Sequence, residues 1–154
     1  MLDTVFGLPV HPLVVHATVV VVPSAALAVV LATLWPRFRA WAGWLPVALS
    51  VAAVVLTPIS TSSGESLEHR KPHTALIEKH AHLAGLLIWW VVPLALVAAA
   101  QWWFGRRGTP GTGLRIGVGV AAVVVAAGTL VQVTLIGHSG AESAWSNVGA
   151  ARTR

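Results

Sequence analysis

Four long apolar stretches constrain this 154-residue sequence more than any other feature. They cover residues 12–35, 45–60, 80–104 and 114–138, and their interiors contain no Asp, Glu, Lys or Arg. A helix needs about 20 predominantly apolar residues to cross the hydrocarbon core of a bilayer. Because a backbone in lipid must satisfy its own hydrogen bonds, each stretch is predicted to be a transmembrane α-helix.

The composition agrees with a membrane protein, since 56% of the residues are hydrophobic and only 10% are charged. Soluble domains carry about 25% charged residues, enough to coat a surface that faces water. We therefore expect an all-α, multi-pass protein whose first partner is the lipid bilayer. Short connections between the stretches favour an up-down-up-down four-helix bundle, with a single domain over residues 1–154 and a short polar tail at 139–154.

The charged residues lie at the ends of the apolar stretches and predict their orientation. The connections after the first and third stretches, together with the start of the fourth stretch, carry only basic charges, which are Arg37, Arg39, Arg106, Arg107 and Arg115. The other side carries an equal number of basic residues, mixed with all the Asp and Glu. Lys and Arg close to span ends favour the cytoplasm, so both termini are expected outside it. This placement explains the net charge of +5 without a nucleic-acid partner.

All seven histidines fall on the side of the predicted bundle that holds the termini. In chain order they are His11, His16, His69, His73, His80, His82 and His138. An imidazole at headgroup depth is commonly an interfacial residue, and the sequence defines no role for His69, His73 or His82. His16 differs, because it lies about 6 Å deeper than Pro12 along the helix axis. An ionisable residue inside the membrane indicates a functional site.

The topology predicts that two of these imidazoles meet. The first and third helices of such a bundle lie diagonally across its core, so His16 and His80 are expected to face each other. Two imidazoles are the protein ligands of a bis-histidine haem b, and the chain has no Cys to supply a thiolate. We therefore expect a haem b electron-transfer protein with axial ligands His16 and His80. His138 would be an alternative ligand or a neighbour of the haem.

Two alternatives remain open at this stage. A non-haem metal site for Zn, Fe or Cu would use a His and Glu cluster at the same level, made of His11, His16, Glu65, His80 and His138. In the second alternative, the chain is an accessory or assembly subunit of a respiratory membrane complex. All three readings favour an electron carrier or binding protein over a substrate-converting enzyme. They are compatible with a redox partner on the extracytoplasmic side and with a homo-oligomer.

Three motifs together resemble a known family. They are L-P-V-H-P-L-V-V-H at 8–16, S-G-E-S-L-E-H with L-I-E-K-H within 63–80, and I-G-H-S-G-A-E-S-A-W at 136–145. In this order on four spans they resemble the bacterial four-span membrane proteins described as domain of unknown function 2231. The resemblance implies a bacterial inner (cytoplasmic) membrane protein, and it places the family pattern on His11, Pro12, His16, Gly64, Glu65, His80, Gly137, His138, Gly140 and Trp145. Some members carry a Rieske-type iron–sulfur domain, which implies a redox setting. This chain has no Cys, so an iron–sulfur partner would be a separate protein.

Overall fold

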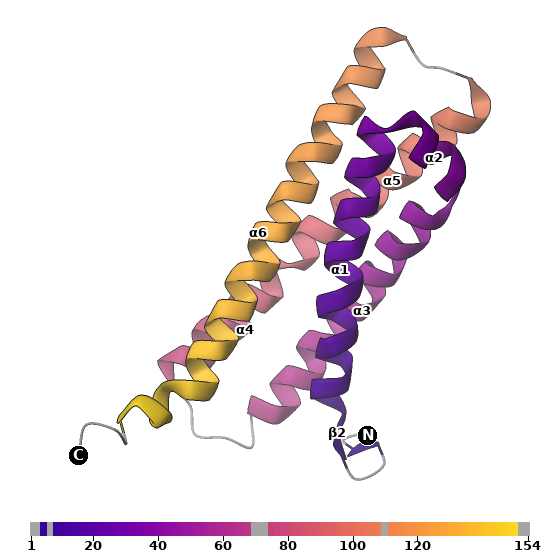
Figure 1. Cartoon of the computed structure of the whole chain (residues 1–154). Helices are drawn as coiled ribbons and strands as arrows, with labels where there is room; N and C mark the ends of the chain where they lie inside the picture. The colour runs from indigo at the N-terminus through magenta and orange to yellow at the C-terminus, as the bar shows by residue number, and fades with distance from the viewer. Residues whose placement is uncertain (1–3, 6–7, 69–73, 109–110, 151–154) are drawn as a thin grey trace.

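Four long helical segments form a bundle in the computed structural model of the chain (Figure 1). The structure describes residues 4–5, 8–68, 74–108 and 111–150. The segments are α1 (Val10–Leu34), α3 (Leu45–Glu68), α4 with α5 (Ala75–Leu86 and Ile88–Arg107), and α6 (Thr112–Ala150). Each is long and apolar enough to cross a membrane, which confirms the predicted all-α, four-span, multi-pass architecture. The start of α1 and the end of α6 lie at the same end of the bundle (Figure 1).

The helices are longer than the apolar stretches that predicted them. α3 continues to Glu68, and α6 continues to Ala150 through most of the expected polar tail. The hydroxyls of Ser63 and Ser139 each donate to a carbonyl three residues earlier in their own helix. Hydropathy predicts only the part of a helix that lies in lipid. The helix itself continues into polar sequence as long as its backbone hydrogen bonds are not interrupted, so it can be longer than the apolar stretch.

Three small elements were not predicted from the sequence. A seven-residue helix, α2 (Pro36–Ala42), begins with a proline in its first turn, where the missing N–H costs nothing. It ends at Gly43, whose φ of 55° favours glycine. The strands β1 (Thr4–Val5) and β2 (Leu8–Pro9) pair antiparallel immediately before α1.

The packing order follows the predicted diagonal arrangement. α1 and α5 each pack mainly against α3 and α6, so α1 and α5 lie across the bundle from each other. α4 extends this third segment towards the end that holds the termini, where it packs against α6. The result is that α1 pairs with α3, and α4 pairs with α6, at the end of the bundle where the histidines lie.

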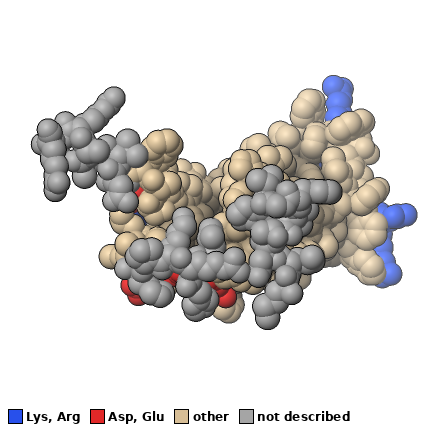
Figure 2. Space-filling view, turned by 90° about the horizontal axis from the view of Figure 1, so that it is seen from below, with Lys and Arg blue, Asp and Glu red and all other residues tan. Residues whose placement is uncertain are grey.

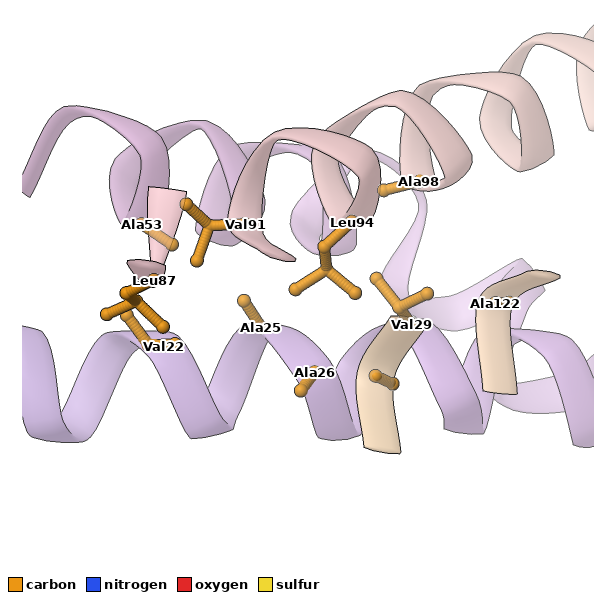
Figure 3. Close-up of a cluster of buried hydrophobic side chains, with 11 residues drawn as sticks. Val22, Ala25, Ala26, Val29, Ala53, Leu87, Val91, Leu94, Ala98 and Ala122 are labelled. Atoms are coloured by element: carbon orange, nitrogen blue, oxygen red, sulfur yellow. The ribbon is translucent and has the colours of Figure 1, made fainter. Parts of the chain in front are cut away.

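Small side chains fill the centre of the bundle. Figure 3 shows Val91 and Leu94 of α5 above Ala25, Ala26 and Val29 of α1. Small residues allow helix backbones to approach closely in a membrane, where packing rather than water exclusion drives association. Elsewhere in the bundle, Trp90 of α5 covers Gly128 of α6 so closely that an added Cβ would collide with the indole ring.

The two ends of the bundle differ in charge. Figure 2 views the molecule from the end that holds the termini, where Asp and Glu side chains gather, with Lys and Arg side chains at the far edge. Among the described residues, the acidic side chains are Glu65, Glu68, Glu78 and Glu142. The opposite end carries the arginines that follow α1 and α5, so the structure retains the charge asymmetry from which the orientation was predicted.

Candidate functional site

A cavity of about 460 Å³ lies at the end of the bundle where α1 begins and α6 ends. Aliphatic side chains form much of its wall, including Val15 and Val19 of α1, Ile77 of α4, and Ile136 of α6. Histidines and glutamates join them, namely His11, Glu65, Glu68 and His80. Cofactor and ligand sites commonly have this size and this mixture of apolar wall and a few polar groups.

His11 reaches the cavity from α1 and is held by α3. Its Nδ1 atom lies 3.0 Å from the Oγ atom of Ser63. Its ring rests on Gly64, where an added Cβ would lie 3.1 Å from the Cε1 atom. That separation is tighter than ordinary van der Waals contact, so a side chain at residue 64 would require the imidazole to shift by a few tenths of an ångström.

His80 reaches the same cavity from α4 and is held by α6 in the same way. Its Nδ1 atom lies 3.0 Å from the Oγ atom of Ser139, and an added Cβ on Gly140 would lie 3.1 Å from its Cε1 atom. We refer to His11 with Ser63 and Gly64, and to His80 with Ser139 and Gly140, as the two His–Ser–Gly units. One unit comes from the α1–α3 pair and the other from the α4–α6 pair.

The serine hydrogen bonds favour one tautomer of both imidazoles. Ser63 Oγ lies 2.9 Å from the carbonyl oxygen of Ser60, and Ser139 Oγ lies 2.9 Å from that of Ile136. A carbonyl only accepts, so a serine hydroxyl that donates to it has its oxygen lone pairs left to accept from Nδ1–H. In a neutral imidazole of this tautomer the lone pair is on Nε2, a nitrogen that can coordinate a metal.

The face of α1 that enters the core explains why His11, and not His16, lines the cavity. Buried or cavity-lining residues follow one another at helical spacing along this face, at positions 11, 15, 18, 22, 25 and 29. His16 lies five residues after His11, a rotation of roughly 140° around the helix axis. It is exposed, and its Nδ1 atom lies 2.6 Å from the carbonyl oxygen of Pro12 in its own helix. The structure therefore brings His11, and not His16, into the cavity with His80.

His138 also points away from the cavity. Its side chain is 72% exposed, and its Nδ1 atom lies 3.6 Å from Glu142 Oε1. The other carboxylate oxygen of Glu142 accepts from Lys79 Nζ at 3.2 Å, which links α6 to α4 at the surface. His82 is exposed as well and does not line the cavity. His69 and His73 lie outside the described residues.

Glu65 is the one predicted carboxylate ligand, and it does line the cavity, as does Glu68. Of the five residues expected for a metal cluster, the structure thus brings His11, Glu65 and His80 to one cavity and leaves His16 and His138 outside it. Within the part of the chain that the structure describes, no three side chains of His, Cys, Asp or Glu converge closely enough to hold a metal ion.

The serines of the two His–Ser–Gly units were not among the residues predicted from the sequence. A signal was present, because S-G-E-S at 63–66 returns as S-G-A-E-S at 139–143 with one inserted residue. Each copy follows an apolar stretch and places a Ser–Gly pair opposite a histidine from the preceding helical segment. Gly64 and Gly140 were identified only through the family resemblance.

A sequence model for a family described as "Predicted membrane protein (DUF2231)" matches residues 7–152 of the chain. The chain belongs to this family. The match includes all four membrane-spanning segments and both His–Ser–Gly units, so the cavity lies entirely within the region shared with the family. No curated protein and no solved structure matches the chain.

Proposed function

We propose that this chain is a bacterial inner-membrane electron-transfer protein that binds one haem b between His11 and His80. The observation that carries the proposal is the pair of imidazoles in one cavity, each with its Nδ1 atom hydrogen-bonded to a serine hydroxyl. A haem with two axial histidines takes its protein ligands as neutral imidazoles. The hydrogen bond at Nδ1 orients such a ring and makes it a stronger donor to the iron.

The surroundings of the two imidazoles support the same ligand. They belong to different helix pairs, α1–α3 and α4–α6, so a macrocycle bound by both would join the two pairs. The aliphatic wall suits the porphyrin, and Gly64 and Gly140 leave room for each imidazole next to a helix backbone. When bound, haem iron supplies one-electron exchange. The residues of this chain would hold the group and orient its ligands.

The position of the site supports exchange of electrons at one membrane face. The cavity lies at the end of the bundle opposite the arginines, and arginines at span ends favour the cytoplasm. The site would therefore face the extracytoplasmic side, where a separate redox partner would dock. One haem at one end is suited to electron exchange with that partner and not to bond-making on a substrate.

A non-haem metal site is the second candidate, because Glu65 and Glu68 line the same cavity as the two histidines. Imidazole and carboxylate together are ligands of Zn and Fe, and Cu(II) also accepts imidazole nitrogen and oxygen donors. Such a site would need these side chains to move towards one point, since a protein-bound Zn takes at least three protein ligands. Two imidazoles already complete the protein ligands of a bis-histidine haem, so the haem requires less rearrangement.

An optical spectrum and elemental analysis of the purified protein separate the two candidates. The protein would be solubilised in detergent, supplied with haem, and recorded in its oxidised and reduced states. We expect a Soret band that shifts on reduction, together with iron in proportion to haem. A metal without a porphyrin spectrum would support the non-haem candidate. Absence of a Soret band in folded protein supplied with haem would overturn the proposal.

A further inference from the structure

The end of the bundle opposite the cavity concentrates arginines beside aromatic residues. The two segments at this end, residues 35–44 and 102–115, contain no acidic residue. Five arginines lie there, all exposed: Arg37, Arg39, Arg106, Arg107 and Arg115. We refer to these five residues as the arginine end. The described acidic residues all lie at the opposite end, so this positive charge is not balanced locally.

Two of these arginines lie over tryptophan rings in the last turns of α5. The guanidinium carbon of Arg107 lies 3.7 Å from the ring centroid of Trp103, and that of Arg106 lies 5.1 Å from the ring centroid of Trp102. A guanidinium stacked on an indole keeps its N–H donors at its edges, where they can bind two oxygens of one phosphate. Stacking therefore orders these side chains without using the donors that bind an anion.

Helix α2 adds aromatic residues at the same end. Trp35, Phe38 and Trp41 follow one another at a spacing of three, with ring centroids 6.5 Å and 5.8 Å apart. Trp41 is 77% exposed and Trp44 is 69% exposed. Exposed tryptophans beside membrane-spanning helices sit at the level of the lipid headgroups, because the indole is apolar with one polar N–H. These residues therefore place the nearby guanidinium groups at the depth of the lipid phosphates.

We propose that the arginine end binds the phosphate groups of anionic phospholipids in the leaflet that it faces. The exposed guanidinium groups match the phosphodiester of a headgroup, and the tryptophans set the depth at which the two meet. The cytoplasmic leaflet is negatively charged, so an end with five arginines and no acidic residue is attracted to it. This inference is independent of any cofactor in the cavity.

Lipid binding by the full-length protein tests the proposal. Protein in mixed micelles would be titrated with phosphatidylglycerol and, separately, with phosphatidylcholine, and the bound lipid measured by native mass spectrometry. We expect preferential binding of phosphatidylglycerol that weakens as salt is raised. The variant R106Q/R107Q should lose about fivefold in affinity for each arginine removed. The variant K79Q removes a positive charge from the opposite end and should bind as the wild type does.

Four further outcomes make the test decisive. A variant R106K/R107K keeps both charges but loses the planar donors, so its affinity should lie between those of the wild type and R106Q/R107Q. Equal binding of the two lipids, or wild-type affinity in folded R106Q/R107Q, would overturn the proposal. Displacement of phosphatidylglycerol by an equal concentration of inorganic phosphate would also overturn it, since it would indicate a general anion site.

Discussion

His80 is bound to Ser139 as His11 is bound to Ser63, with 3.0 Å between Nδ1 and Oγ in both pairs. In each pair the imidazole also lies over the glycine that follows the serine. The two halves of the chain thus supply matching His–Ser–Gly units to a single cavity. Two similarly held imidazoles in one cavity are suited to a ligand that needs two similar donors, and a haem iron is such a ligand.

The glycine under each imidazole should be essential for the position of the ring. In Gly64→Ala or Gly140→Ala, the added Cβ would lie 3.1 Å from Cε1, so the imidazole must move. We expect each variant to bind haem at least tenfold more weakly, measured by titration of the apoprotein. Gly117→Ala is the matched control, because an added Cβ there has nothing within 4 Å. Unchanged affinity in both site variants would show that the glycines do not position the ligands.

The serines should tune the reduction potential of the bound haem. In Ser63→Ala or Ser139→Ala, an imidazole loses the acceptor for its Nδ1–H and becomes a weaker donor to ferric iron. Each variant should retain haem and show a higher reduction potential in a redox titration. Ser62→Ala is the control, because that exposed hydroxyl donates to its own helix at Ile59. A potential that stays at the wild-type value in both variants contradicts this role.

The contact between Trp90 and Gly128 should limit the stability of the bundle. Gly128→Ala forces a methyl group into the indole, and overpacking of this kind costs about 1–3 kcal/mol in the free energy of unfolding. Unfolding in detergent, followed by circular dichroism, measures the change. The double variant Trp90→Leu with Gly128→Ala should recover part of the loss, since the two sites are in contact. Additive losses would show that the two residues are not coupled.

Hydropathy was sufficient to predict the four membrane-spanning segments and the end of the bundle that carries the histidines. It did not indicate which face of a helix points inwards, because α1 is apolar on every side apart from a few residues. The buried positions Val22, Ala25 and Val29 define that face, and extending their spacing backwards leads to Thr18 and His11. His16 was predicted as a ligand because of its depth in the membrane. The depth of a residue does not indicate which way its side chain points around the helix axis.

The hydrogen-bond partners of the two imidazoles were beyond prediction from the spacing alone. Ser63 and Ser139 lie 52 and 59 residues from their histidines, and only the packing of α1 on α3 and of α4 on α6 brings them together. The lengths of α3 and α6 were underestimated for a related reason. The Ser–Gly pairs lie beyond the second apolar stretch and at the end of the fourth, where polar residues suggested that each helix had ended.

The orientation of the chain can be tested by labelling, because the sequence contains no Cys. Ala141→Cys places one thiol at the end with the cavity, and Gly111→Cys places one at the arginine end, both at exposed positions. We expect a membrane-impermeant maleimide to label Ala141→Cys in intact spheroplasts, and Gly111→Cys only after lysis. The reverse pattern would place the cavity on the cytoplasmic side and contradict the proposed position of the redox partner.

Haem titration of two double variants shows whether His11 and His80 are the haem ligands. His11→Ala/His80→Ala removes both cavity imidazoles, whereas His16→Ala/His138→Ala removes two exposed ones and leaves the cavity intact. We expect His16→Ala/His138→Ala to bind one haem per chain with the wild-type Soret band. We expect His11→Ala/His80→Ala, once circular dichroism has shown that it is folded, to bind no haem in this form. Loss of the band in His16→Ala/His138→Ala alone, or its retention in His11→Ala/His80→Ala, would show that His11 and His80 are not the ligands.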